Sequence, residues 1–206
     1  RARRAATRSW PVAYCEQPVL NGTGGAILAA LPQIEKLPCR RFIITMGDVP
    51  LIAPSTYLRL LQGLARHAVM VLAFAPPDPG QYGRLEMDGD RVRRIVEWKY
   101  WKDFPDHRKA CLKWCNAGVY AATRQALLRF IPELEARPHE VRKQRGADWV
   151  TFNEYFLTDV VGLMSEKGLP VGVVETDEEE VIGVDTPEAL ERVQAIYARG
   201  GNRPET

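Results

Sequence analysis

Two aspartates stand where a carboxylate could hold a divalent cation. Asp48 follows the apolar run at residues 41–46, and Asp185 follows residues 181–184, which we predict to be a short strand. Ligands of open α/β sheets bind at the carboxyl ends of the strands, and carboxylates beside phosphates are typical protein ligands of Mg²⁺. Alternatively, Asp48 caps a turn, and Asp185 is the N-cap of a helix that begins at Pro187.

A glycine-rich turn, Asn21-Gly22-Thr23-Gly24-Gly25, follows Gln17 and precedes an apolar segment. Glycines allow backbone N–H groups to approach a ligand, and the positive end of a helix dipole favours anions. The turn lacks the Lys-[Ser/Thr] pair of a P-loop and the spacing of a dinucleotide fingerprint. It could therefore bind a ligand or simply begin a helix.

Polar residues also surround a predicted hairpin, with Gly83 before it and Glu97 and Lys99 at its end. A glycine permits close approach of a ring, a glutamate can accept hydrogen bonds from hydroxyls, and a lysine can face a phosphate. A surface Glu/Lys pair is the alternative. Asn116 lies within a predicted strand, so its amide needs a ligand or a backbone group as partner.

The cysteines and histidines show no constellation that performs chemistry. Four scattered cysteines favour reduced thiols over a disulfide scaffold, and hence a reducing compartment. Cys111 and Cys115 could share a helix face as metal ligands, but no second pair accompanies them. We assign no role to the histidines, which lack triad or metal spacing: His67, His107 and His139.

Apolar runs and amphipathic segments alternate along most of the chain. Strands are predicted at residues 41–46, 69–74, 84–87, 92–96, 114–121 and 171–174. Helices are predicted at residues 26–31, ended by Pro32, then at 54–64, 124–130, 155–167, capped by Gly168, and 187–197. Residues 135–148 are charged and predict an exposed connection or flap. The pattern predicts one α/β domain whose mostly parallel sheet is flanked by helices and carries an antiparallel hairpin lid.

Composition excludes several classes of protein. The chain has 206 residues, 46% hydrophobic and 26% charged, with a net charge of +2, so no strong field favours nucleic acid. No apolar run approaches the roughly 20 residues of a membrane span. We therefore expect a cytoplasmic protein that binds neither membrane nor nucleic acid. An arginine cluster near the start could be a phosphate-binding tail or a solvated terminus: Arg1, Arg3, Arg4 and Arg8.

The order of the motifs over residues 17–190 is more specific than any one of them. The motifs are Gln17 with Asn21-Gly22-Thr23-Gly24, Gly47-Asp48-Val49-Pro50-Leu51-Ile52, Tyr82-Gly83-Arg84, Ile95-Val96-Glu97-Trp98-Lys99, Asn116-Ala117-Gly118-Val119-Tyr120, Glu154-Tyr155-Phe156-Leu157-Thr158-Asp159 and Gly183-Val184-Asp185-Thr186-Pro187. This series resembles the uridyltransferase domain of the bifunctional N-acetylglucosamine-1-phosphate uridyltransferases, in the sugar-1-phosphate nucleotidyltransferase family.

The resemblance implies a Rossmann-like nucleotidyltransferase fold that transfers a uridylyl group from UTP to a sugar-1-phosphate and releases pyrophosphate. N-acetylglucosamine-1-phosphate is the expected acceptor. The implied uracil contacts are Gln17, Gly22 and Thr23. The ribose and phosphates would lie along Met46, Gly47 and Asp48. The amino sugar would be held by Gly83, Glu97, Asn116 and Thr158, with Lys99 as a further substrate contact. Asp48 and Asp185 would act as the catalytic pair and bind Mg²⁺.

The sequence departs from that family in two ways. Asp185 stands where the family has a metal-binding asparagine. Related sugar-phosphate nucleotidyltransferases carry aspartate at that position. The family's opening strand, its Gly-rich Arg/Lys loop and a second lysine-bearing segment do not occur in residues 1–206, nor do the hexapeptide repeats of a β-helix acetyltransferase domain. We expect an N-terminally incomplete domain, poorly stable or inactive alone, because the strand at residues 42–44 is too apolar for a sheet edge.

Two other functions fit parts of the pattern. A metal-dependent glycosyltransferase would hold its metal through a carboxylate motif, but such motifs usually place a second acidic residue two positions after the first. Pro50 occupies that position here. A non-catalytic nucleotide-sugar-binding or regulatory protein would keep the pocket without the triphosphate loop.

Overall fold

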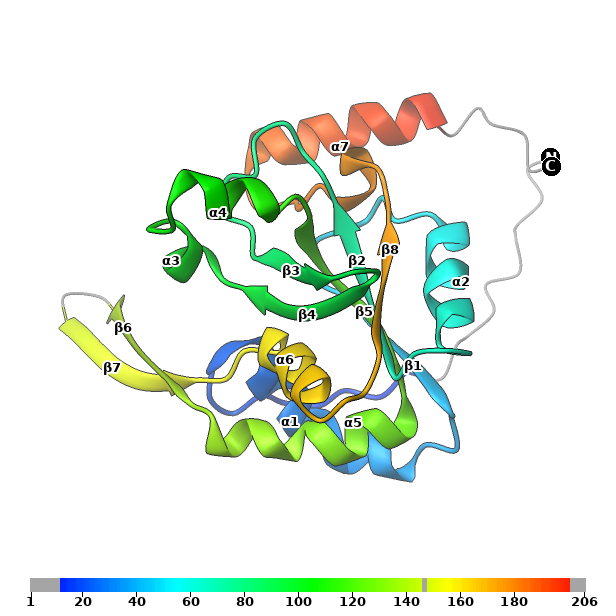
Figure 1. Ribbon diagram of the computed structural model, residues 1–206, viewed down its shortest axis with the longest axis vertical. Helices are drawn as coiled ribbons and strands as arrows, with labels where there is room; N and C mark the ends of the chain where they lie inside the picture. The colour runs from blue at the N-terminus through cyan, green and yellow to red at the C-terminus, as the bar shows by residue number, and fades with distance from the viewer. Residues whose placement is uncertain (1–11, 146–147, 201–206) are drawn as a thin grey trace, which may run out of the picture.

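The computed structural model describes residues 12–145 and 148–200 (Figure 1). The arginine cluster at the start of the chain lies outside the described residues. The described part forms an α/β fold in which helices cover a central sheet, as the sequence predicts. Within it, no helix is both long and apolar enough to span a bilayer.

The central sheet is mixed. Its strands are β1 (Arg41–Ile44), β2 (Val69–Phe74), β3 (Arg84–Asp88), β4 (Arg91–Val96), β5 (Cys115–Thr123) and β8 (Val171–Glu175). The order is β4-β3-β5-β2-β8. Strand β3 contacts β5 only at Cys115, and β1 pairs with the other end of β5, at residues 120–123. Only the β2–β8 pair is parallel among the described pairs, so the prediction of a mostly parallel sheet is corrected to a mixed one.

Helices lie on both faces of this sheet (Figure 1). They are α1 (Gly22–Lys36), α2 (Pro54–Gly63), α3 (Trp98–Trp101), α4 (Asp106–Cys111), α5 (Arg124–Phe130), α6 (Thr158–Glu166) and α7 (Pro187–Gly200), with short 3₁₀ turns η1 (Pro132–Ala136) and η2 (Glu178–Val181). Helices α5 and α6 cover one face, and α2 covers the other. The described residues therefore form three layers, with a large apolar core on each face of the sheet and a smaller cluster around Trp101.

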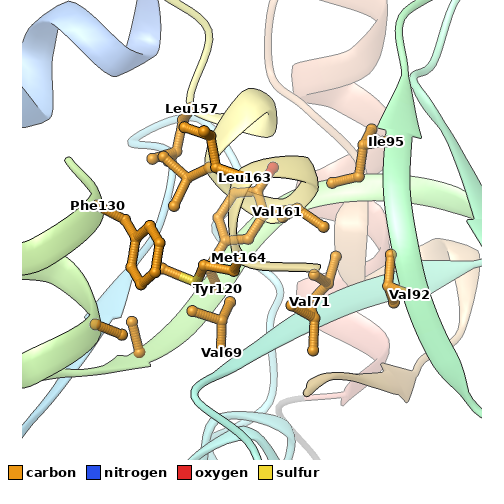
Figure 2. Close-up of a cluster of buried hydrophobic side chains, with 14 of the residues drawn as sticks. Val69, Val71, Val92, Ile95, Tyr120, Phe130, Leu157, Val161, Leu163 and Met164 are labelled. Carbon is orange, nitrogen blue, oxygen red and sulfur yellow. The ribbon is translucent and has the colours of Figure 1, made fainter. Parts of the chain in front are cut away.

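The alternation of side chains along β2 explains why both faces are buried. Val69 and Val71 point into the core beneath α5 and α6, where Phe130 and Met164 are fully buried (Figure 2). Met70 and Leu72 point to the opposite face, against Leu60 and Leu64 at α2. Successive residues of a strand face opposite sides, so a continuous apolar run fits a strand covered by helices twice.

Strand β1 is antiparallel to β5 and half-buried, which differs from the expected buried parallel strand. It ends at Ile44, two residues before the predicted end. Within the described residues it has one strand neighbour, β5, while its other edge carries no strand. The apolar side chains of Phe42 and Ile44 pack on the core from this position.

Several predicted boundaries move because tertiary hydrogen bonds compete with local propensity. Helix α1 passes through Pro32, because Leu28 and Leu31 pack on the core and compensate for one lost backbone bond. Helix α6 begins at Thr158 rather than 155, since the amides of Tyr155 and Leu157 donate to α1. Residues 181–184 are not a strand; η2 ends at Val181 and the following residues are irregular.

The charged segment at residues 135–148, expected to be an exposed connection or flap, contains regular structure. It includes the last two residues of η1 and strand β6 (His139–Arg145), which pairs with β7 (Asp148–Glu154) in a two-stranded ribbon. Figure 1 shows this ribbon projecting from the body of the protein. Its two ends, near His139 and Glu154, lie beside each other at the base.

The cysteine pair that could have shared a helix face does not do so. Helix α4 ends at Cys111, which is exposed, whereas Cys115 begins β5 and is buried. All four cysteines are free thiols. Burial raises the pKa of Cys115 to about 11, although the nearby Arg84 guanidinium acts in the opposite direction.

This difference predicts selective thiol reactivity. A thiolate is the reactive form, so a high pKa and burial both protect Cys115 at pH 8. A chromogenic disulfide reagent should react rapidly with the exposed thiols of Cys15, Cys39 and Cys111 and with a fourth only after denaturation. Cys115→Ala should remove the thiol that reacts only after denaturation. Four equally fast thiols in the native protein would contradict the burial of this strand.

Candidate functional site

A cavity of about 350 Å³ brings together six of the residues that the sequence nominated. They come from four of the motifs and from the residue that precedes Gly47-Asp48: Gly22, Thr23, Met46, Glu97, Asn116 and Thr158. Five further residues complete the lining, namely Gly118, Tyr120, Glu154, Phe156 and Leu157. We call this cavity the central pocket.

The first turn of α1 forms one wall of the central pocket. The Gly24 amide donates to the Tyr155 carbonyl at 2.8 Å, and the Tyr155 amide donates to the Asn21 carbonyl at 2.8 Å. Gly22 has φ +93°, and a Cβ there would lie 2.5 Å from the Tyr155 oxygen. Glycine is therefore required by both backbone conformation and contact. The glycine-rich turn begins a helix as well as lining a cavity.

Gln17 braces this turn from outside the central pocket. Its Nε2 donates to Asn21 Oδ1 at 2.9 Å and to the Gly22 carbonyl at 3.1 Å. These bonds use the amide donors of Gln17 within the protein. The carbonyl oxygen of its side chain retains its capacity to accept.

A bulge in β5 presents Asn116 to the central pocket. Val71 pairs with Tyr120 and Ala73 with Asn116, so β5 uses two more residues than β2 over this stretch. Gly118 lies in the bulge with φ +73°, a conformation that side chains rarely adopt. The Asn116 amide donates to the Tyr120 hydroxyl oxygen at 2.8 Å, and its oxygen accepts from the Gly118 amide at 3.1 Å.

Tyr120 remains a neutral phenol in this setting. Burial raises its pKa, the charge of Glu97 raises it further, and the hydrogen bond from Asn116 acts in the opposite direction. Because its oxygen already accepts from Asn116, the phenol hydrogen remains available to a ligand in the central pocket.

Glu97 and Thr158 form the opposite wall. The buried Thr158 hydroxyl donates to Glu97 Oε1 at 2.6 Å, which fixes the carboxylate. Gly83 lies outside the cavity lining, but a Cβ at this position would lie 3.4 Å from Glu97 Oε2 and 3.1 Å from Ile95. The absence of a side chain at Gly83 therefore leaves room for the carboxylate.

Lys99 is not part of the cavity lining. Its ammonium lies 4.6 Å from the Phe156 ring centroid and 4.8 Å from that of Tyr100. Both contacts are within the range of cation–π attraction. Lys99 thus supports the aromatic residue that lines the central pocket.

The two aspartates lie on adjoining loops. The Val184 amide donates to the Asp48 carbonyl at 2.8 Å, which joins the loop after β1 to the loop before α7. Burial raises the pKa of Tyr82, and the charges of Asp185 and Asp48 are among the causes that raise it further. Both aspartates therefore lie near one phenol. Gly47 and Asp48, the two residues that follow Met46, are exposed, whereas Met46 lines the central pocket.

Neither carboxylate is engaged in a structural role. Thr186 is the residue that caps α7, because its Oγ1 accepts from the Ala189 amide at 3.1 Å. Within the part of the chain that the structure describes, the side chains of Asp48 and Asp185 make no hydrogen bond or ion pair. The same part contains no group of three or more His, Cys, Asp or Glu side chains that could enclose a metal.

Sequence reasoning missed five residues of the central pocket and one beside the aspartates. The five belong to the same motifs as Asn116 and Thr158, and that adjacency was the available signal: Gly118, Tyr120, Glu154, Phe156 and Leu157. Tyr82 precedes Gly83 in its motif. Which of these side chains face the cavity depends on the bulge at Gly118 and on the irregular backbone before α6.

The sequence comparisons agree with this geometry. The chain is 39% identical over 178 residues to the bifunctional protein GlmU of Cereibacter sphaeroides strain ATCC 17025, covering 86% of this chain and 36% of the relative. GlmU of Rhodopseudomonas palustris strain BisB5 is 36% identical over 176 residues, with 85% and 35% covered. This chain is homologous to one segment of the GlmU proteins. It spans about a third of the length of these curated relatives.

The solved structures show the same fold. A uridine diphosphate N-acetylglucosamine pyrophosphorylase from Trypanosoma brucei matches with a TM-score of 0.65 at 14% identity, over 86% of this chain and 42% of that one. A protein described as a putative UDP-N-acetylglucosamine pyrophosphorylase from Entamoeba histolytica matches with a TM-score of 0.62 at 14% identity, over 87% and 52%. No family model matches the chain.

Glu180 holds the loop that leads to Asp185 in this GlmU-like segment. Its Oε2 accepts from the Thr56 hydroxyl at 2.7 Å and from the Ala53 amide at 3.1 Å, at the start of α2. Thr56 is fully buried. A carboxylate at a helix N-terminus also interacts favourably with the helix dipole. The loops that carry the two aspartates are therefore joined through α2 as well as through the backbone.

Glu180→Ala should lower the free energy of unfolding by about 1–3 kcal/mol, because it leaves the buried Thr56 hydroxyl and the Ala53 amide without their acceptor. Urea denaturation would measure this difference. Glu179→Ala is the matched control, since Glu179 is exposed and should change stability by no more than about 0.5 kcal/mol. Equal stability of the two variants would contradict the capping role.

Proposed function

We propose that the protein transfers a uridylyl group from UTP to a sugar-1-phosphate, with N-acetylglucosamine-1-phosphate as the acceptor and pyrophosphate as the second product. The observation that carries the proposal is the central pocket, where six nominated residues from distant parts of the sequence meet. The names of the sequence relatives and of the structural neighbours support the same chemistry.

The walls of the central pocket suggest how the two substrates divide it. The uracil would lie against the first turn of α1, where Gly22 and Thr23 are accessible and Gln17 braces the backbone. The amino sugar would lie against Glu97, Asn116 and Thr158. There a fixed carboxylate and an amide offer complementary partners for hydroxyl and acetamido groups.

The ribose and phosphates would extend along Met46 and Gly47 towards Asp48 and Asp185. Two free carboxylates on adjoining loops fit Mg²⁺, which typically binds one or two carboxylates together with substrate phosphates rather than an all-protein cage. Asp48 and Asp185 would hold the ion, and it would neutralise charge on the phosphates. No third protein ligand is needed for this mode of binding.

The reaction requires little covalent help from the protein. An oxygen of the sugar-1-phosphate attacks the α-phosphorus of UTP, a new P–O bond forms, and the bond to pyrophosphate breaks. The attacking phosphate is already anionic, so no general base is required. The residues of this chain contribute by positioning both substrates and excluding water, which are major sources of catalysis in phosphoryl transfer.

The decisive experiment measures pyrophosphate release across a panel of nucleoside triphosphates and sugar-1-phosphates, with the full-length protein. We expect the highest kcat/KM with UTP and N-acetylglucosamine-1-phosphate. Tight binding of both substrates without turnover would instead indicate a regulatory protein. Hydrolysis of a nucleotide sugar, or transfer of its sugar to another acceptor, would indicate a glycosyltransferase.

The metal assignment has a test that does not depend on turnover. Asp48→Asn and Asp185→Asn should each weaken Mn²⁺ binding, followed by electron paramagnetic resonance in the presence of UTP, by about tenfold or more. Asp90→Asn, in the exposed turn of the β3–β4 hairpin, is the control and should bind Mn²⁺ like the wild type. Unchanged binding in either site variant would remove that residue from the metal site.

The sugar assignment predicts a selective defect. Glu97→Ala should weaken sugar-1-phosphate binding by about 1.5–3 kcal/mol, the cost of losing a charged hydrogen bond, and affect UTP much less. Calorimetric titration of each substrate would separate the two effects. The exposed Glu135→Ala should alter neither affinity. Equal losses for UTP and sugar phosphate would indicate that Glu97 maintains structure rather than binding the sugar.

A further inference from the structure

A histidine at the base of the β6–β7 ribbon joins three elements behind the central pocket. The Nε2 of His139 lies 2.6 Å from Asp159 Oδ2 in α6, and its Nδ1 lies 3.2 Å from the Tyr100 hydroxyl in α3. The side chains of His139 and Asp159 are only 22% and 26% exposed. The bonds are therefore partly shielded from water.

The partners fix how the histidine ring uses its two nitrogens. A carboxylate oxygen only accepts, so Nε2 carries a proton and donates to Asp159. In the neutral ring Nδ1 then accepts from the Tyr100 hydroxyl, and both nitrogens are satisfied. One imidazole thus holds α3, β6 and α6 in a fixed relation.

The same ring supports a residue of the central pocket. His139 stacks on Phe156 with ring centroids 4.4 Å apart and an angle of 19° between the planes. Phe156 lines the central pocket, whereas His139 lines a neighbouring cavity of about 500 Å³. The two stacked rings form part of the partition between these cavities. The ammonium of Lys99 lies over the Phe156 ring.

Asp159 transmits this restraint to the expected sugar contacts. Its amide donates to the Phe156 carbonyl at 3.1 Å, which closes the turn that begins α6. The preceding residue, Thr158, donates to Glu97 Oε1 at 2.6 Å. Fixing the Asp159 carboxylate therefore fixes the backbone that orients Thr158, and Thr158 in turn orients Glu97.

The ribbon makes this restraint necessary. A two-stranded hairpin has little stability of its own, and β7 leads directly into the irregular residues before α6. His139 pairs with Glu154 across the base of the ribbon, next to Tyr155. Unless its base were held, motion of the projecting ribbon would displace the residues after β7, which form a wall of the central pocket.

We propose that His139 is a positioning residue of the sugar side of the central pocket. It acts through Asp159 and Phe156 and does not touch the reacting atoms. This inference rests on the proposed function for its kinetic consequences, but its structural consequence is independent of the substrate.

The kinetic test compares substrates. His139→Ala should raise the KM for N-acetylglucosamine-1-phosphate about tenfold, equivalent to about 1.4 kcal/mol, and leave the KM for UTP and kcat within about twofold. Asp159→Ala should have a similar effect, and the double variant should be little worse than either single one, because both changes break one interaction. His139→Gln, which keeps a donor, should recover part of the loss. The exposed His107→Ala is the control.

The structural test measures hydrogen exchange at two amides of the pocket wall. The Tyr155 amide donates to Asn21 and the Leu157 amide to Thr23, so both report on the junction of α1 with the segment before α6. His139→Ala should accelerate exchange at both by about tenfold, and His107→Ala should not.

The outcomes separate the inference from the proposed function. Unchanged exchange in His139→Ala would overturn the positioning role whether or not the sugar phosphate binds. Equal increases in KM for both substrates, with a lowered melting temperature, would also overturn it in favour of general stability. If the wild type binds no sugar-1-phosphate, the proposed function fails, while faster exchange in His139→Ala still supports the positioning role.

Discussion

The hydrogen-bond ladder of β5 is the constraint on which the rest of the structure depends. This strand pairs with β1, β2 and β3, so the segments that carry Met46 and Gly83 are both placed relative to one backbone. The ladder is interrupted only at Gly118, where the bulge turns Asn116 towards the central pocket. A regular strand would have kept the pairing and lost the orientation of this amide.

Long-range hydrogen bonds then join the motifs that β5 does not reach. Thr23 accepts from Leu157 across 134 residues of sequence, and Thr158 donates to Glu97 across 61. Each bond fixes a polar group that lines the central pocket, and each uses a partner that the protein itself supplies. The pocket is therefore largely preformed, which reduces the entropy lost when a ligand binds.

Charge is distributed unevenly around the site. Asp48 and Asp185 remain free on exposed loops, whereas Glu97 is held by Thr158 and Glu180 caps α2. The neighbours of each carboxylate, rather than its residue type, therefore determine whether it is free, held in place or bound to the start of a helix. Free carboxylates suit a cation and phosphates, and a fixed carboxylate suits a sugar whose hydroxyls need defined acceptors.

The sequence by itself determined the elements with strong local signals and six of the residues that line the central pocket. The hairpin at residues 84–96, the strand Val69–Phe74 and the helix Arg124–Phe130 follow from alternation, apolar runs and capping residues. The nominated residues that line the central pocket could be named because their motifs occur in a recognisable order.

Only the tertiary structure decided features that depend on partners distant in sequence. Periodicity could not show that β1 runs antiparallel to β5, since an apolar run looks the same in either direction. The sequence predicts a helix over residues 155–157, yet the amides of Tyr155 and Leu157 bond to Asn21 and Thr23 at the start of α1 instead. His139 showed no spacing to any partner, because Asp159 and Tyr100 approach it only after the chain has folded. Local patterns specify which residues are available, and long-range hydrogen bonds specify which of them meet.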